Sequence, residues 1–247
     1  MRQKIRRLTL LISFLLFPIT IWYFSPYLII QGFSEHVMNG SFFVFVLMFL
    51  LSMFFGRAWC GYLCPTGGLQ ECVQRINVKS AKQGKRDRIK FVIWILWMTA
   101  VVVTFILGKN KVTINPFYMT KHGISISEIN HYVVYYGVVF FVVAPALIHG
   151  KRAFCHYVCW MAPFMIIGST VGRWLHLPQF HIEIETDQCV GCGKCSTACP
   201  MGLDVRKLVS EDKDGAIKTT ECIQCGACVD DCPKKVLSYR MRFTKRG

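Results

Sequence analysis

Charged residues are scarce in this chain of 247 residues, and acidic residues are fewer than half as many as basic ones. Only 17% of the residues are charged, whereas soluble globular chains have about a quarter. Asp and Glu number 14 against 29 Lys and Arg, and 53% of the residues are hydrophobic. This composition excludes a single soluble domain. The long apolar runs lie mostly before residue 150 and the cysteine-rich stretch lies after residue 180, so the sequence predicts two regions in different solvents.

Four stretches contain no Asp, Glu, Lys or Arg. They are residues Leu8–Ile30, Ser41–Gly56, Phe91–Leu107 and Tyr132–Ile148. A helix needs about 20 apolar residues to cross about 30 Å of hydrocarbon, so these stretches predict four transmembrane helices within residues 1–150. The second stretch is short, and we expect its helix to continue through Arg57 to Cys60, because the only helix breaker nearby is a glycine.

No histidine lies inside these four stretches, which argues against a b-type haem held between two histidines at bilayer depth. No set of acid–base or nucleophilic residues that would form an active site is evident. The formal charge of +15 does not indicate nucleic-acid binding, because the basic residues lie beside apolar stretches and not on one aromatic-studded surface.

The distribution of Lys and Arg predicts how the chain is oriented in the membrane. Basic residues are frequent in the N-terminal segment, in residues 75–90 and directly after the fourth stretch, whereas residues 31–40 have none and residues 108–131 have three lysines. Short loops rich in Lys and Arg stay in the cytoplasm. We therefore expect an inner-membrane protein whose two termini both face the cytoplasm.

Eight of the thirteen cysteines occur in a repeated pattern. The segments CVGCGKCSTACP (189–200) and CIQCGACVDDCP (222–233) both have the spacing C-x2-C-x2-C-x3-C-P. In bacterial ferredoxins this spacing binds two [4Fe-4S] clusters, each held by three cysteines of one motif and the fourth of the other. The expected ligands are Cys189, Cys192, Cys195 and Cys232 for one cluster, and Cys222, Cys225, Cys228 and Cys199 for the second. Zinc ribbons would not need cysteines at these offsets twice, and disulfide frameworks belong to short secreted domains.

A second pair of cysteine motifs follows the apolar stretches. RAWCGYLCPTG comes after the second stretch and RAFCHYVCWMAP after the fourth, so Cys60, Cys64, Cys155 and Cys159 are expected at one membrane face. On a helix, residues i and i+4 share a side, so the two pairs could converge on a four-thiolate site. Two interpretations stay open. The site holds a third iron–sulfur cluster, or the thiols are redox-active, adjacent to a quinone or simply buried.

Arg57 and Arg152 stand three residues before the first cysteine of these two motifs. Either arginine could favour thiolate over thiol, or could anchor a helix end at the lipid headgroups. Cys72 has no assigned role. Quinol oxidation needs a base near a membrane face, and a histidine could supply it. The alternative is that each candidate is an ordinary interfacial histidine. The candidates are His36, His122, His131, His149 and His156.

With these parts the chain resembles the NapH/NosR-like family of membrane polyferredoxins, which are quinol dehydrogenase membrane components. The resemblance rests on the four apolar stretches, the two Cys-x3-Cys motifs and the two ferredoxin motifs. It implies a protein that passes electrons between the quinone pool and a partner iron–sulfur or reductase subunit. The first motif has the family form Cys-x3-Cys-Pro, whereas Trp160 replaces the proline of the second and His156 stands where glycine is common.

The sequence therefore predicts an all-α membrane region with four transmembrane helices and a small α+β ferredoxin domain of the bacterial 2[4Fe-4S] type. Residues 1–150 form the membrane region, residues 151–180 hold the second Cys-x3-Cys motif and an interfacial or re-entrant helix, and residues 181–247 form the cytoplasmic ferredoxin domain. We expect an electron-transfer subunit of a quinol-dehydrogenase-like complex, with lipid, quinone and redox or reductase subunits as partners. The alternative is a redox-sensing or maturation factor for a membrane or periplasmic metalloenzyme.

Overall fold

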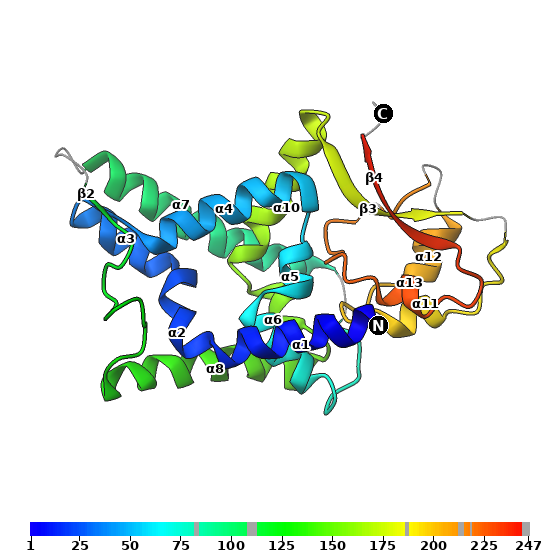
Figure 1. The fold of residues 1–247 in the computed structure, drawn as a ribbon, viewed down its shortest axis with the longest axis horizontal. Helices are drawn as coiled ribbons and strands as arrows, with labels where there is room; N and C mark the ends of the chain where they lie inside the picture. The colour runs from blue at the N-terminus through cyan, green and yellow to red at the C-terminus, as the bar shows by residue number, and fades with distance from the viewer. Residues whose placement is uncertain (82–83, 108–112, 186–187, 212–214, 218, 244–247) are drawn as a thin grey trace.

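The computed structural model describes residues 1–81, 84–107, 113–185, 188–211, 215–217 and 219–243. Within these residues the chain folds into a helical part, from Arg2 to Trp174, and a smaller α+β part, from Pro178 to Phe243. The two parts lie next to each other along the longest axis of the molecule (Figure 1).

Most elements of the helical part are short. In chain order they are α1 (Arg2–Leu15), α2 (Phe17–Thr20), the 3-10 helix η1 (Ile21–Phe24), α3 (Pro26–Ser34), β1 (Val37–Asn39), α4 (Gly40–Phe55), α5 (Ala58–Tyr62), α6 (Pro65–Val73), η2 (Lys85–Arg88), α7 (Ile89–Leu107), β2 (Thr113–Asn115), α8 (Ile129–His149), α9 (Ala153–Tyr157) and α10 (Met161–Trp174). The α+β part contains β3 (Pro178–Ile184), α11 (Lys194–Ala198), α12 (Val205–Ser210), α13 (Ala227–Asp230) and β4 (Leu237–Phe243).

Two helices of the described residues are long and apolar enough to cross a membrane. They are the continuous helix Lys85–Leu107, formed by η2 and α7, and α8. α1 and the helical segment Phe17–Phe24 meet the same criteria together, but they are bent by 59° at their junction. α4 is apolar and has 16 residues. Of the four predicted transmembrane helices, two are therefore long and apolar enough in the described residues, or three if the bent pair is one span, and the fourth stays a prediction.

The first apolar stretch, Leu8–Ile30, does not form one helix. The chain divides it among α1, the segment of α2 and η1, and α3. Pro18 is the second residue of α2, and Pro26 is the first residue of α3. A proline has no backbone N–H, and in a continuous helix its ring would clash with the carbonyl group four residues earlier. Each proline therefore begins a new helical segment.

The helix of the second apolar stretch ends earlier than predicted. α4 stops at Phe55, and Gly56 has a left-handed φ of +54°. This conformation favours glycine and interrupts an α-helix, so α5 begins separately at Ala58. The prediction that this helix continues through Arg57 to Cys60 is wrong. The break brings the chain close to the α+β part, since a Cβ on Gly56 would lie 2.8 Å from Nε2 of Gln224.

α10 packs along α4 through two glycines spaced four residues apart (Figure 1). A Cβ on Gly168 would lie 2.8 Å from the carbonyl oxygen of Phe49 and would collide with the hydroxyl of Ser52. A Cβ on Gly172 would lie 3.0 Å from the carbonyl carbon of Met53. Small residues at this spacing let helix backbones approach closely in apolar surroundings. The 14-residue α10 leads directly into β3 and thereby connects the two parts.

The connections between the long helices fall at two opposite ends of the helical part (Figure 1). At one end β1 pairs in parallel with β2, with Val37 opposite Thr113. At the other end the N-terminus and α5 lie beside the α+β part, and Nε2 of Gln3 donates a hydrogen bond to the carbonyl oxygen of Cys225 over 2.9 Å. The N-terminal segment predicted to be cytoplasmic thus contacts the α+β part.

In the α+β part, β3 pairs antiparallel with β4, and Ile184 lies opposite Leu237. α11 and α13 begin after Gly193 and Gly226, which both have a left-handed φ. Gly226 is also closely packed, because a Cβ there would lie 2.8 Å from ring atoms of Tyr239. These glycines turn the chain between successive cysteines of each ferredoxin motif.

We expect Gly168→Ala to destabilise the protein by about 1 to 3 kcal/mol, because the added methyl group overpacks the contact between α10 and α4. The measurement is thermal unfolding of the detergent-solubilised protein, followed by circular dichroism. Gly137→Ala in α8 is the matched control, since among the described residues nothing beyond the nearby backbone of its own helix lies within 4 Å of the position of its Cβ and alanine favours helix over glycine. Equal melting temperatures for Gly168→Ala and the wild type would contradict this packing.

Candidate metal centres

Four cysteines of the α+β part line one cavity near the protein surface. They are Cys189, Cys192, Cys195 and Cys232, and we call them set I. The first two are exposed, and the other two are half-buried. Set I takes three cysteines from the first ferredoxin motif and the fourth from the second, which is the grouping expected from the spacing.

Four further cysteines line a second, apolar cavity. They are Cys199, Cys222, Cys225 and Cys228, and we call them set II. The remaining wall residues are aliphatic side chains, one methionine and one glycine. Burial raises the pKa of Cys222 to about 12 and that of Cys199 to about 11. Thiols in these surroundings keep their protons at neutral pH unless a metal ion displaces them.

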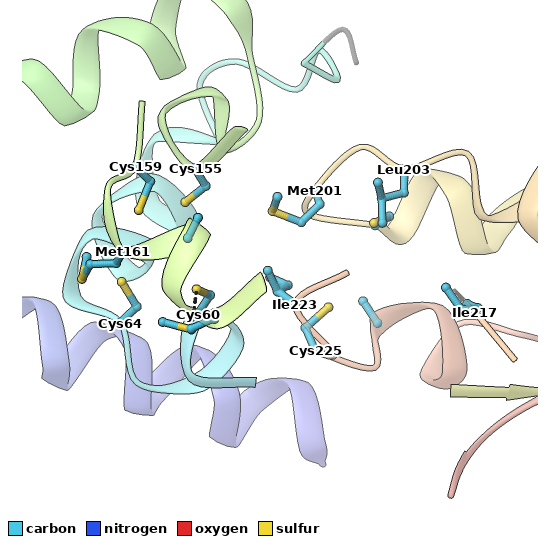
Figure 2. Packing of buried hydrophobic residues seen from close by; sticks show 14 of the residues in the cluster. Cys60, Cys64, Cys155, Cys159, Met161, Met201, Leu203, Ile217, Ile223 and Cys225 are labelled. Carbon is cyan, nitrogen blue, oxygen red and sulfur yellow. Dashed lines mark hydrogen bonds between the residues drawn. The ribbon is translucent and has the colours of Figure 1, made fainter. Parts of the chain in front are cut away.

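The cysteines of the other two motifs also come together, at the end of the helical part that faces the α+β part (Figure 2). Cys60, Cys64, Cys155 and Cys159 are all buried, and we call them the membrane-edge set. Sγ of Cys60 lies 3.6 Å from Sδ of Met165, and Nε2 of Gln70 donates to Sγ of Cys155 over 3.0 Å. Burial raises the pKa of Cys64 to about 12, and it raises the pKa of Cys159 well above the ordinary thiol value.

The two cysteines of each membrane-edge motif do not share one helix. α5 ends at Tyr62, and Cys64 is the extended residue before α6. α9 ends at Tyr157, and Cys159 lies between α9 and α10. The expected stripe of cysteines at positions i and i+4 is therefore wrong. The chain turns between the two cysteines of each pair, and at the first motif Pro65 begins the new helix.

Glu71 in α6 binds two buried arginines beside the membrane-edge set. Arg6 contacts both of its carboxylate oxygens, and Nη2 of Arg152 lies 3.0 Å from Oε2. Nη1 of Arg152 also donates to the carbonyl oxygen of Cys60 over 2.8 Å. Burial opposes ionisation of Glu71, but Arg152 and Arg6 outweigh it and lower its pKa to about 2. The group therefore has one carboxylate for two buried cations.

Glu221, directly before the second ferredoxin motif, binds two cations of the helical part. Its Oε2 lies 3.0 Å from Nη1 of Arg57, and its Oε1 accepts a hydrogen bond from Lys90. Nη1 of Arg57 also donates to the carbonyl oxygen of Thr220 over 3.0 Å. Burial opposes ionisation of Glu221, but Arg57 and Lys90 hold its pKa below the usual range. These contacts fasten the α+β part to the helical part.

His156 is buried beside the same ions. Its Nε2 lies 2.8 Å from the carbonyl oxygen of Met201, and its Nδ1 lies 3.7 Å from Oε2 of Glu221. Burial lowers the pKa of His156 below its ordinary value, so the ring is neutral at neutral pH. His156 is enclosed and does not face the lipid interface, and its role as a base for quinol oxidation stays a prediction. His149, at the end of α8, is exposed.

Arg57 and Arg152 leave N–H groups and positive charge unmatched near the membrane-edge set. Their side chains are 2% and 0% exposed, so they do not anchor helix ends at headgroups. Within the described ranges, Nε and Nη2 of Arg57 and Nε of Arg152 are buried and have no hydrogen-bond partner. A buried cation without compensation is strongly destabilising. Four iron-bound thiolates are anionic and would supply both charge and acceptors, so the surroundings fit an iron–sulfur cluster.

The spacing of the cysteines differs from that of a site for one ion. In the part of the chain that the structure describes, no group of three or more Cys, His, Asp or Glu side chains lies close enough to hold a single metal ion. Zinc needs ligands at about 2.0 to 2.3 Å from one atom. A [4Fe-4S] cube has four iron atoms and binds one cysteine at each, so its ligands do not converge on one point. The motif spacing of sets I and II is the one that binds such cubes in bacterial ferredoxins.

The membrane-edge set approaches set II across one glycine. A Cβ on Gly61 would lie 3.6 Å from the backbone of Cys225 and would meet the carbonyl oxygen of Ile223. Figure 2 shows Ile223 and Cys225 on the side that faces Cys60. Set II in turn adjoins set I, since α13, which contains Cys228, packs against α11, which contains Cys195. The three sets therefore follow one another from the helix ends to the surface of the α+β part.

Sequence reasoning missed the two buried carboxylates and their partners Arg6 and Lys90. A signal was available, because acidic residues are few and two of them lie next to or just after a cysteine motif. Glu221 directly precedes Cys222, and Glu71 lies seven residues after Cys64. The partners carried no comparable signal, since Arg6 and Lys90 belong to basic segments that the positive-inside rule already explains.

Two protein-family descriptions match this chain. Residues 181–233 match a family described as a 4Fe-4S dicluster domain. Residues 40–83 and 130–177 match a family described as a 4Fe-4S binding domain, and these two ranges contain all four cysteines of the membrane-edge set. The chain therefore contains ferredoxin-type 4Fe-4S domains, and the cysteines of both regions fall inside them.

Curated relatives are distant. An uncharacterized protein of Methanocaldococcus jannaschii, MJ0749, is 25% identical over 75% of this chain and 70% of its own length. YccM of Escherichia coli, named provisionally as an electron transport protein, is 23% identical over 74% of this chain and 52% of its own length. A second uncharacterized M. jannaschii protein, MJ0750, is 25% identical over 67% of this chain and 68% of its own. No solved structure matches the chain, and the resemblance to the NapH/NosR-like family stays a prediction.

We expect Glu71→Gln to destabilise the protein by about 3 to 5 kcal/mol, because the change leaves Arg6 and Arg152 buried without their counter-ion. Thermal unfolding of the purified protein in detergent at pH 7 measures the effect. The pKa of about 2 means that Glu71 is ionised at this pH, so the amide removes a full negative charge.

Glu128→Gln is the matched control for this change. Glu128 pairs with Lys121 over 2.8 Å, but both side chains are more than half exposed. Exposed ion pairs contribute little to stability, so this variant should melt like the wild type. If the two variants lost the same amount of stability, the buried position of Glu71 would not be the source of the effect.

Proposed function

We propose that this chain is a membrane-bound electron-transfer protein that relays electrons between the quinone pool or a redox partner and a reductase system. The observation that carries the proposal is the succession of three four-cysteine sets from the helix ends to the protein surface. Iron–sulfur clusters bound at such sets supply one-electron transfer, while the protein supplies position and charge. The name of YccM, which refers to electron transport, adds support.

We assign one [4Fe-4S] cluster to set I and a second to set II. The two motifs give each set three neighbouring cysteines, and the chain crosses between the sets at Cys199 and Cys232. Backbone hydrogen bonds from Ser196 and Ala227 act on the sulfurs of Cys195 and Cys225. Such donors stabilise sulfur ligands in the anionic form that iron binds.

A third [4Fe-4S] cluster is assigned to the membrane-edge set. The family match over residues 40–83 and 130–177 supports this assignment, as do the buried N–H groups of Arg57 and Arg152 that lack partners among the described residues. These two arginines would hold the charge of the cluster and its ligands, and Glu71 and Glu221 would fix their orientation.

The proposed location is the inner membrane, with both termini and the ferredoxin domain in the cytoplasm. The two long apolar helices support a membrane protein, and the clustering of Lys and Arg in the connections nearest the ferredoxin domain supports the orientation. The membrane-edge set lies next to the helix ends, which is where electrons from a lipid-soluble quinol would reach the protein. From there the cysteine sets lead to the cytoplasmic surface.

The purified protein should contain about twelve iron atoms and as many acid-labile sulfides per chain, four for each of three cubes. The double variant Cys60→Ser/Cys155→Ser should contain about eight, because it disables the membrane-edge set and leaves sets I and II intact. Iron and sulfide analysis after anaerobic purification, together with electron paramagnetic resonance of the reduced protein, measures both.

Cys72→Ser is the matched control, because Cys72 is exposed and belongs to none of the three sets; it should keep the full iron content. About eight iron atoms in the wild type would restrict the clusters to the ferredoxin part. A colourless protein that holds zinc would contradict the proposed function as a whole.

A further inference from the structure

Set I is the most exposed of the three cysteine sets. Cys189 and Cys192 are exposed, and Val190 between them is 63% exposed. The membrane-edge set is buried, and set II lies in an apolar cavity between the other two. A second protein that exchanges electrons with this chain can approach most closely at set I.

Basic side chains surround set I. Arg206 and Lys234 line its cavity, Lys194 lies with Cys192 at an adjoining hollow, and Lys235 follows Lys234. All four are exposed, and within the described ranges none of them forms an ion pair. We call these four residues the basic rim.

Acidic residues near set I are mostly engaged elsewhere. Asp204 caps α12 by accepting a hydrogen bond from the backbone N–H of Lys207. Asp230 accepts a hydrogen bond from Gln3 and lies 3.7 Å from Arg2. Among the described residues near set I, Asp231 lies at the hollow that contains Lys194. On the described surface the four cations of the basic rim therefore outnumber the carboxylates of Asp204 and Asp231.

We propose that the basic rim docks the acidic face of a separate electron-transfer protein, so that the partner's redox centre lies against set I. The inference rests on the proposed function, because it requires a cluster at set I. Complementary charges steer encounter and can raise association rates by about 10 to 1,000-fold at low salt. The four rim cations suit docking because none of them forms an ion pair within the described ranges. A carboxylate of this chain bound to one of them would weaken its attraction for the acidic surface of a partner protein.

The test uses one redox probe in two charge forms. Native cytochrome c is basic, and the same cytochrome with succinylated lysines is acidic, so the two share a haem and differ in surface charge. The chain is reduced as the holoprotein in detergent, excess reductant is removed, and cytochrome reduction is followed by stopped flow. At about 10 mM salt we expect the acidic form to react at least about 10-fold faster than the basic form. The difference should vanish near about 500 mM salt, where charges are screened.

Charge-reversal variants test whether the basic rim causes the preference for the acidic cytochrome. The double variant Arg206→Glu/Lys234→Glu should lose at least about 10-fold in its rate with succinylated cytochrome at low salt. The matched control is Arg75→Glu/Lys79→Glu, which makes the same change of charge at exposed residues that line no part of the set I cavity; its rate should equal that of the wild type. The iron content and the potential of the set I cluster are measured in both.

Equal rates for the two cytochromes at low salt, or an equal loss in both double variants, would overturn the docking proposal. The proposal would also be overturned if Arg206→Glu/Lys234→Glu shifted the potential of the set I cluster and left the preference for the acidic cytochrome unchanged. The basic rim would then act by balancing the negative charge of that cluster. Absence of a cluster at set I in the wild-type holoprotein would instead contradict the proposed function, so the two failures are distinguishable.

Discussion

The buried ion groups at the junction of the two parts are the constraint on which the rest depends. Arg57 and Arg152 place positive charge inside the protein, beside the four cysteines of the membrane-edge set. In the proposed function this charge would balance the anionic sulfur ligands of a cluster. Two arginines cannot be buried there alone. Glu71 and Glu221 make their burial possible, since each carboxylate binds one of them together with a further cation. Scarce acidic residues are therefore concentrated where the fold requires them.

The same groups determine how the two parts fit together. Glu221 directly precedes the second ferredoxin motif in the α+β part, whereas Arg57 and Lys90 belong to the helical part. Gly61 removes the side chain that would otherwise separate the membrane-edge loops from set II. Electron transfer weakens with distance between redox centres. Under the proposed function, a junction held by these ion pairs and closed at Gly61 would bring the cluster of the membrane-edge set near that of set II.

The repeated spacing of cysteines was enough to predict the grouping into sets I and II, because a ferredoxin motif is local in the sequence. Long uncharged runs likewise predicted α7 and α8. The breaks were harder to predict. Gly56 could have been accommodated within a helix, and only its left-handed φ shows that it ends one. The convergence of Cys60 with Cys155 depends on turns within each motif and on contacts between residues some ninety positions apart, such as Arg152 with the carbonyl of Cys60, which no local pattern records.

The position of α1 has a consequence for the cooperativity of the fold. Gln3 in α1 contacts Cys225 and Asp230, which lie 222 and 227 positions later in the sequence. Contacts between residues so far apart close a long loop of chain, and the entropy lost in closing it has to be offset by the packing of the α+β part. The docking of α1 therefore couples the stability of the helical part to that of the α+β part.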